Sequence, residues 1–252
     1  MLNETRFAVK LARGSGKILI NNLNKVKSVR EKSPRNLVTD IDLASEKLII
    51  SSIKKEYPAH KVLSEEAGEI DGKSDYKWVI DPLDGTHNYI HRFPLFGVSI
   101  ALEYKGDVIL GVIYLPTMRQ MFTAEKGKGA FLNGRKILTS KLSEIRDSMV
   151  SMDSSFSNSK RVMLGTLSRL IDRVFRIRIP GSAVFELTSV AQGITSAHIS
   201  YFTNPWDVAA GFLIITEAGG KITDFNGKSV NHYCREFVAT NSILHDKILN
   251  CL

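Results

Sequence analysis

Residues 81–89 read DPLDGTHNY, and they follow the apolar run YKWVI of residues 76–80. The apolar and aromatic run predicts a buried strand that ends at Asp81. The proline and glycine that follow predict a turn, which leaves Asp81, Asp84 and the carbonyl of Leu83 free to face one point. Carboxylate and carbonyl oxygens are the ligands that Mg²⁺ takes in proteins. The alternative is a turn whose carboxylates only accept hydrogen bonds from backbone amides, and the stretch alone leaves both interpretations open.

Three further acidic sites stand at predicted ends of strands or helices. Glu65 follows a short apolar stretch, Asp40 and Asp42 open one helical pattern, and Asp207 opens another. Each has an alternative role, because adjacent glutamates usually form a solvated surface and aspartates often cap a helix or complement its dipole. Four acidic sites at four element ends nevertheless indicate a shared function better than four separate capping events.

Three motifs in a fixed order connect the sequence to a known family. The chain resembles the inositol monophosphatase family of Mg²⁺-dependent, lithium-sensitive phosphatases, which carries a G/S-E-E, a D-P-[IL]-D-G-T-x-N-[FY] and a W-D-x-A-[AG]-G motif. The matching residues are 64–66, 81–89 and 206–211, and the likeness extends from about residue 30 to about residue 245. The resemblance implies hydrolysis of a small phosphorylated polyol or sugar, such as inositol monophosphate or fructose 1,6-bisphosphate.

The resemblance also implies a set of metal ligands. Glu65, Asp81 and the carbonyl of Leu83 would bind a first Mg²⁺ ion, and Asp81, Asp84 and Asp207 a second. It implies two or three ions per active site, with Mn²⁺ able to substitute. Such ions neutralise an anionic phosphate ester and lower the pKa of a bound water.

The resemblance further assigns Asp42, Thr86 and Glu65 as catalytic residues. Thr86 matches a family threonine whose hydroxyl, paired with a remote Asp, orients the attacking water. That Asp maps onto Asp42, which makes Asp40 an exposed or capping residue. The backbone N–H groups of Gly85 and Thr86 are expected to bind the phosphate, as helix N-termini bind anions, and Gly85 allows a close backbone approach.

The likeness reaches the substrate pocket, with one departure. A G-[ST]-A stretch lines the pocket in the family, and Gly181, Ser182 and Ala183 match it. Arg178 is expected either to hold a second anionic group or to lie on the solvent face of a strand edge. Inositol-specific members usually carry a Glu six residues before the W-D pair, where this chain has Ser200. The departure keeps open 3′(2′),5′-bisphosphate nucleotidase or NADP phosphatase activity.

Composition limits the class of protein. With 252 residues and 43% hydrophobic content, the chain can bury a large core in one or two joined domains. No apolar run reaches the length of a membrane span, and the first residues show no signal-peptide pattern. Two cysteines are too few for a disulfide framework. We therefore expect a cytoplasmic protein without a membrane partner.

A net charge of +8 admits a different class of function. Basic residues gather in two stretches, Lys25, Lys27, Arg30, Lys32 and Arg35, then Arg169, Arg173, Arg176 and Arg178. Such patches can bind nucleic acid, and one bacterial family member is associated with ribosomal RNA transcription. An RNA-associated binding protein is therefore the alternative of another class. Because no RNA-binding motif with interleaved aromatic residues is present, we expect a small phosphorylated substrate rather than nucleic acid as the partner.

The layout predicts an α/β protein with an antiparallel first half and an alternating second half. The first half has helices at 3–24 and 42–56 and strands near 76–81, 96–104, 108–115 and 119–125. The second has strands near 149–153, 174–179, 197–202, 220–222 and 236–238 and helices at 158–173, 182–193 and 206–218. We expect an α+β half, residues 1–140, with the metal and phosphate motifs, and an α/β half, residues 141–252, with the substrate pocket and Asp207. The resemblance implies the layered αβαβα sandwich of the sugar phosphatases and a homodimer.

Overall fold

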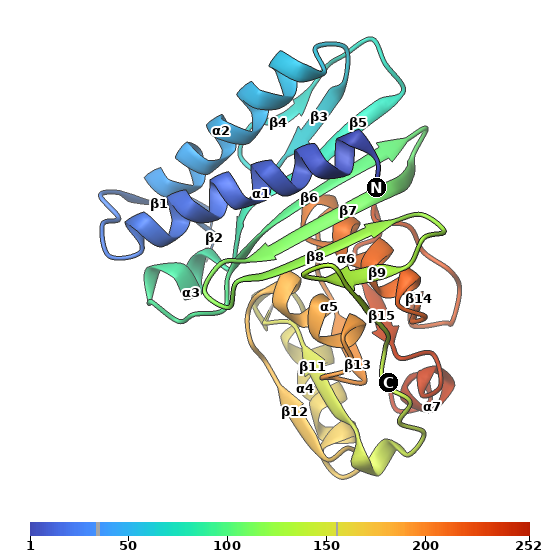
Figure 1. Ribbon diagram of the computed structural model, residues 1–252. Helices are drawn as coiled ribbons and strands as arrows, with labels where there is room; N and C mark the ends of the chain where they lie inside the picture. Colours follow the sequence, from blue (N-terminus) through green and yellow to red (C-terminus); the bar gives the residue numbers. More distant parts are fainter. Residues whose placement is uncertain (34–35, 155) are drawn as a thin grey trace.

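A computed structural model of the protein describes residues 1–33, 36–154 and 156–252, and it shows helices and sheets in alternating layers (Figure 1). The helices of the described residues are α1 (Asn3–Asn22), α2 (Asp40–Glu56), α3 (Thr86–Ile90), α4 (Phe156–Ile171), α5 (Ala183–Ala191), α6 (Pro205–Glu217), α7 (His245–Leu249) and a 3₁₀ turn, η1 (Ile145–Asp147). Among them, none combines the length and apolar character that crossing a membrane requires.

The larger sheet carries the first half of the chain. Its strands, in spatial order, are β10 (Arg135–Ile137), β9 (Ala130–Leu132), β8 (Gln120–Glu125), β7 (Asp107–Leu115), β6 (Gly97–Tyr104), β5 (Tyr76–Asp84), β3 (Lys61–Ser64) and β4 (Gly68–Ile70). β3 and β5 are parallel, and the other neighbours are antiparallel. The hairpin between β6 and β7 turns at Lys105 and Gly106, both with positive φ, and it joins two of the predicted strands.

The smaller sheet carries the second half. Its strands, in spatial order, are β12 (Arg176–Arg178), β11 (Met149–Met152), β13 (Ala197–Ser200), β15 (Phe237–Thr240) and β14 (Lys221–Thr223). β12, β11 and β13 run parallel, whereas β15 is antiparallel to both of its neighbours. The parallel strands place the segments that follow β11 and β13 at one edge of the sheet, which matters for the site below.

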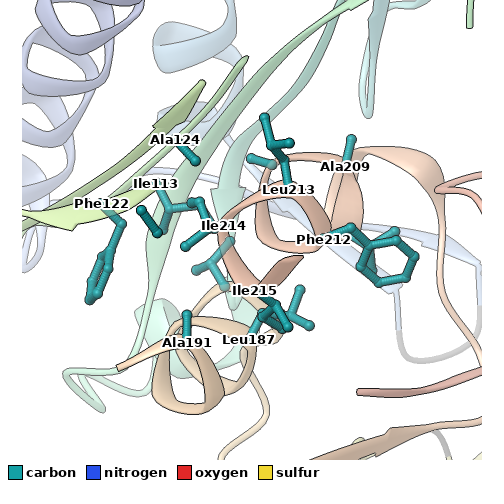
Figure 2. Close-up of a cluster of buried hydrophobic side chains, with 14 of the residues drawn as sticks. Ile113, Phe122, Ala124, Leu187, Ala191, Ala209, Phe212, Leu213, Ile214 and Ile215 are labelled. Atoms are coloured by element: carbon teal, nitrogen blue, oxygen red, sulfur yellow. The ribbon is translucent and has the colours of Figure 1, made fainter. Parts of the chain in front are cut away.

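Three apolar cores separate the layers. α1 and α2 cover one face of the larger sheet, with Trp78 and Ile100 among the buried residues there. α5 and α6 lie between the two sheets, where Phe122, Leu187 and Ile214 pack together (Figure 2). α4 and α7 cover the far side of the smaller sheet. This order of layers confirms the predicted αβαβα sandwich.

The strand that leads into the DPLD stretch is longer than the sequence predicted. We expected it to end at Asp81, but β5 continues to Asp84, which pairs with Gly97 of β6. The register shifts between Asp81 and Asp84, so the strand bulges at the proline. A bulge of this kind changes the direction of the side chains near it. Both carboxylates therefore come from a paired strand and not from a free turn.

A second difference concerns residues 28–40. The described residues of this stretch include two antiparallel strands that pair as a hairpin, β1 (Val29–Ser33) and β2 (Asn36–Thr39), which the sequence analysis did not predict. Its amino acids are mostly polar and charged, so the apolar pattern that marks other strands is missing. α2 then begins at Asp40, two residues before the predicted start, with Thr39 as its N-cap.

Candidate active site

Asp81 and Asp84 are buried at the end of β5. Asp81 is 2% exposed, and its Oδ1 accepts a hydrogen bond of 3.0 Å from the N–H of Leu83. Burial raises the pKa of Asp81 well above its usual range, and the negative charges of Glu65, Asp84 and Asp207 raise it further. Carboxylates that affect one another in this way lie in one low-dielectric region, so the fold brings the predicted acidic residues together.

Asp84 faces the start of α5. Its carboxylate accepts hydrogen bonds from Ser182 Oγ, from the N–H of Ala183 at 3.0 Å and from the N–H of Val184 at 3.4 Å. Burial nevertheless raises its pKa to about 6. The Asp84 carboxylate therefore connects β5, which carries the predicted metal ligands, to the start of α5, which carries predicted substrate residues.

Asp207 lies in the first turn of α6. It forms a capping box with Asn204, whose N–H donates to Asp207 Oδ2 at 2.8 Å. Burial raises the pKa of Asp207 to about 7, and the charge of Asp84 contributes to the shift. The capping role considered from the sequence is thus real, and it coexists with a place in the carboxylate cluster.

Glu65 is paired with Lys32, a residue whose role the sequence analysis did not identify. Lys32 Nζ lies 2.8 Å from Glu65 Oε1 and 2.6 Å from Glu66 Oε1. Burial raises the pKa of Glu65 to about 7 although the lysine opposes this shift. The sequence places Lys32 in a basic stretch, and the β1–β2 hairpin directs it to these glutamates. Arg35 of that patch lies outside the described residues.

The carboxylate cluster suits a hard divalent cation by its chemistry. Its donors are carboxylate oxygens, which Mg²⁺ and Mn²⁺ prefer, and a cation would relieve their mutual repulsion. Across residues 1–33, 36–154 and 156–252, however, no three His, Cys, Asp or Glu side chains are already arranged around one metal position. The hydrogen bonds given above explain this, because Glu65 faces Lys32, Asp84 faces Ser182 and Asp207 faces Asn204.

Thr86 and Asp42 form the pair that the resemblance implied. Thr86 Oγ1 lies 3.1 Å from Asp42 Oδ1 and 3.1 Å from the carbonyl oxygen of Leu83. The other carboxylate oxygen of Asp42 accepts from the N–H and the hydroxyl of Thr39. Asp42 is fully buried, and burial raises its pKa while these hydrogen bonds lower it. Asp42 therefore completes the cap of α2 and contacts Thr86 with its second oxygen.

Gly85, next to Thr86, and Asp40, two residues before Asp42, both have the surroundings that the sequence suggested. Gly85 has a φ of 81° and precedes the short helix α3, and a Cβ there would lie 2.9 Å from the carbonyl oxygen of Leu95. Only glycine fits both the conformation and the space. Asp40 accepts hydrogen bonds from the N–H groups of Lys27 and Ser28 at 3.1 and 3.2 Å, so it caps the loop before β1.

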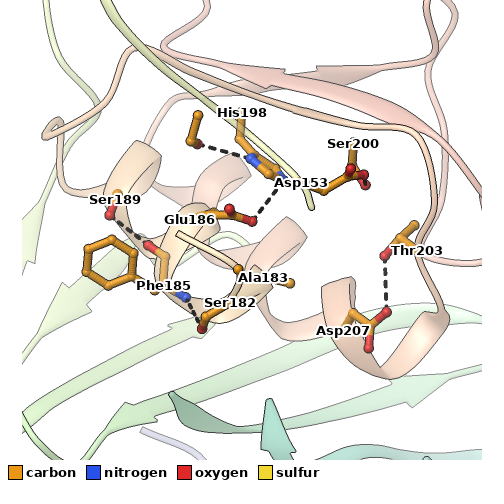
Figure 3. A network of polar contacts seen from close by, with 12 residues as sticks. Asp153, Ser182, Ala183, Phe185, Glu186, Ser189, His198, Ser200, Thr203 and Asp207 are labelled. Atoms are coloured by element: carbon orange, nitrogen blue, oxygen red, sulfur yellow. Dashed lines mark hydrogen bonds and ion pairs between the residues drawn. The ribbon is translucent and has the colours of Figure 1, made fainter. Parts of the chain in front are cut away.

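A cavity of about 180 Å³ adjoins Asp84 and Asp207. Its walls hold Gly181, Ser182, Ala183 and Ser200, together with Asp153, Ser154, Glu186, His198, Phe202, Thr203, Val208 and Phe237. Figure 3 shows the polar contacts of Ser182, His198 and Asp207. Arg178 lines a different cavity, of about 330 Å³, and its Nη1 donates to the carbonyl of Ile177 at 3.0 Å. The structure thus brings four of the five predicted substrate residues to the carboxylates and leaves Arg178 apart.

The cavity also contains titratable groups that the sequence analysis missed. Glu186 is 2% exposed, and its Oε2 lies 3.5 Å from Nε2 of His198, which is 1% exposed. Burial lowers the pKa of His198 to about 4 and raises the pKa of Glu186 well above its usual range. A Glu in the first turn of an otherwise apolar helix was the signal available, but it is equally typical of a dipole contact.

Comparisons with known proteins give consistent matches in sequence and in fold. Residues 2–251 match the inositol monophosphatase family. The chain is 35% identical over 244 residues to a fructose-1,6-bisphosphatase/inositol-1-monophosphatase from Thermotoga maritima, with 96% of this chain and 93% of that protein covered. It is 37% identical over 232 residues to the Nus factor SuhB of Escherichia coli, with coverages of 90% and 86%. The solved structure of a Thermotoga maritima IMPase superimposes with a TM-score of 0.92 at 34% identity, covering 99% of this chain and 96% of that one.

Proposed function

This chain belongs to the inositol monophosphatase family, and we propose that it is a Mg²⁺-dependent phosphomonoesterase acting on a small phosphorylated polyol or sugar. The observation that carries the proposal is the buried carboxylate cluster beside a cavity, with the Thr86–Asp42 pair next to it. Inositol monophosphate and fructose 1,6-bisphosphate are the proposed substrates, because a similar protein is named for both activities.

The proposed metal ligands are Glu65, Asp81, the carbonyl of Leu83, Asp84 and Asp207, which would hold two or three ions. Bound Mg²⁺ would neutralise the charge of the phosphate and lower the pKa of a water bound to it. The chain's own contribution is to keep Asp81 and Asp84 buried and Glu65 and Asp207 partly buried, where their attraction for a cation is strong. Because Asp81 and Asp84 serve as ligands, neither is available as a nucleophile, and we expect no phosphoenzyme.

Thr86 is the residue that orients the attacking water. Its hydroxyl has one hydrogen, which it donates to Asp42 Oδ1 or to the carbonyl of Leu83. Donation to Asp42 leaves the lone pairs of Thr86 Oγ1 free to accept a hydrogen bond from a water. Asp42 is held in place by Thr39, so the pair is oriented before substrate binds. The backbone N–H groups at Gly85 and Thr86 are the proposed phosphate donors.

The test is phosphate release from a panel of compounds in Mg²⁺ and in EDTA. The panel is inositol 1-phosphate, fructose 1,6-bisphosphate, adenosine 3′,5′-bisphosphate and NADP⁺. We expect turnover of the first two, lost in EDTA and in Asp84→Asn, and retained in Asp172→Asn, which changes an exposed carboxylate after α4. Preference for the nucleotides would instead support the bisphosphate nucleotidase or NADP phosphatase alternative. Silence across the panel with folded, metal-loaded protein would overturn the proposal.

A binding role in transcription is the second candidate, because one similar protein is a Nus factor. The basic residues of the second patch give it little support. Arg169 donates from Nε to the carbonyl of Cys251 and from Nη2 to that of Leu252, and the guanidinium of Arg176 stacks on Phe175. These arginines therefore hold the end of the chain and a neighbouring ring. A gel-shift titration with RNA at increasing salt tests this role separately from phosphatase activity.

We also propose that the protein is a cytoplasmic homodimer, as the family resemblance implies. Sedimentation equilibrium of the purified chain tests the oligomeric state, and a concentration-independent monomer would contradict it.

A further inference from the structure

Asp153 lies at the edge of the substrate cavity, directly after β11. Its Oδ2 accepts hydrogen bonds from Ser200 Oγ at 2.8 Å, from the N–H of Tyr201 at 2.6 Å and from the N–H of Phe202 at 3.2 Å. Asp153 and Ser200 lie side by side in Figure 3. Three donors on one oxygen fix the orientation of the carboxylate before any ligand enters.

The topology of the smaller sheet places Asp153 there. β11 and β13 are parallel neighbours, with Met152 opposite Ile199. The N–H of Asp153 continues the ladder by donating to the carbonyl of Ile199 at 3.1 Å. Ligands of such sheets bind beyond the carboxyl ends of the parallel strands. The position of Asp153 is therefore set by backbone pairing and does not depend on a free loop.

The cavity around Asp153 has a polar and acidic character. Asp84, Asp207, Asp153 and Ser200 all line it. Glu186 also lines the cavity, and its buried Oε1 has no hydrogen-bond partner among the described residues. Among the residues that the structure describes, those lining the cavity include no Lys or Arg. If the scissile phosphate lies against the metal-binding carboxylates, the alcohol part of the substrate occupies the space next to Asp153.

We propose that the Asp153 carboxylate is a specificity-determining group that accepts a hydrogen bond from a substrate hydroxyl and disfavours a second phosphate at that position. The inference rests on the proposed phosphatase function. Carboxylates accept hydrogen bonds from hydroxyls, and a phosphate dianion placed near Asp153 meets the like charge of that carboxylate. The favoured substrate class is thus a polyol or sugar monophosphate.

The experiment compares kcat/KM for inositol 1-phosphate with that for phenyl phosphate, which has no alcohol hydroxyl. In Asp153→Asn the ratio of the two values should fall by about tenfold to a hundredfold, the range for a hydrogen bond to a charged group. The ratio of fructose 1,6-bisphosphate to inositol 1-phosphate should rise, because the repelling charge is gone. Asp172→Asn, an exposed change of the same kind, should leave both ratios as they are in the wild type.

The alternative is that Asp153 only holds the backbone of residues 200–202. In that case Asp153→Asn would lower kcat/KM for inositol 1-phosphate and phenyl phosphate equally, and the inference would be wrong. Ser200→Ala is the second variant should Asp153→Asn fail to fold, because it removes one of the three donors. Its expected fall in the first ratio is about threefold to tenfold, and an unchanged ratio would also overturn the inference.

The outcomes separate this inference from the proposed function. Wild-type protein that hydrolyses neither compound contradicts the phosphatase proposal, and the hydroxyl role of Asp153 falls with it. Wild-type protein that hydrolyses both, with ratios that the Asp153 and Ser200 variants do not change, contradicts only the role of Asp153.

Discussion

Replacing Asp84 by asparagine should stabilise the metal-free protein while it removes phosphatase activity. Asp84 is 8% exposed, and burial raises its pKa from 3.8 to about 6. A difference of about two pKa units corresponds to about 3 kcal/mol, at about 1.4 kcal/mol per unit. This is the free energy by which the ionised Asp84 carboxylate destabilises the folded state when no metal is bound.

The pH dependence has a definite sign. The folded pKa of Asp84 is higher than the unfolded one, so the folded state binds the proton more tightly. Stability from this group is therefore greatest below the unfolded pKa and decreases as pH rises through the folded pKa of about 6. The full penalty of about 3 kcal/mol applies near pH 8, and about half of it remains near pH 5.

The loss of hydrogen bonds offsets part of the stability that Asp84→Asn gains. Asparagine keeps one acceptor oxygen, so some of the bonds from Ser182, Ala183 and Val184 are lost. With about 1 kcal/mol for this loss, the variant should be more stable by about 2 kcal/mol near pH 8. For a chain of this length that is an increase of about 5 °C in Tm. Near pH 5 the advantage should shrink to less than about 1 kcal/mol.

The assay is thermal unfolding followed by circular dichroism in EDTA and in Mg²⁺, at both pH values. Asp172→Asn is the control for the removal of one carboxylate. Mg²⁺ should raise the Tm of the wild type and of the control, because a ligand that binds the folded state stabilises it, and it should raise the Tm of Asp84→Asn much less. A variant that is less stable than the wild type in EDTA near pH 8 would refute the electrostatic reasoning. An equal response to Mg²⁺ would remove Asp84 from the metal ligands.

Three other predictions concern separate parts of the molecule. Thr86→Ala should lower kcat by about a hundredfold and change Mg²⁺ affinity far less, by kinetics and calorimetry; an unchanged kcat would exclude Thr86 from the mechanism. Burial lowers the pKa of His245 from 6.5 to about 4, so about 3 kcal/mol of stability should be lost as pH falls from the unfolded toward the folded pKa. In urea unfolding with Mg²⁺ present, the free energy of unfolding of His245→Asn should depend less on pH than that of the wild type. Glu103→Gln removes the buried carboxylate 3.1 Å from Lys77 and should lower the free energy of unfolding in urea by about 3 kcal/mol. Glu69→Gln, at the exposed partner of the same lysine, should lower it by less than about 1 kcal/mol. Equal losses would contradict the importance of burial.

Much of the fold follows from local patterns. The apolar run before Asp81 predicts β5, and the Lys105-Gly106 turn between two apolar runs predicts the β6–β7 hairpin. Such features depend on neighbours in the chain, because period and turn chemistry act over a few residues. The polar β1–β2 hairpin and the extension of β5 to Asp84 were missed because they depend on cross-strand partners, Gly97 among them.

The candidate site likewise combines features that local sequence patterns predict with features that depend on distant partners. The sequence by itself determined the chemical groups, since Asp81, Asp84 and Thr86 stand in one short motif whose residue types suit metal and phosphate chemistry. Only the tertiary structure decided the partners of those groups. Lys32 meets Glu65 across 33 positions of the chain, and Asp153 meets Ser200 across 47. Contacts of this kind are set by strand pairing and by the packing of layers, and neither leaves a periodic signal in the sequence around the residues involved.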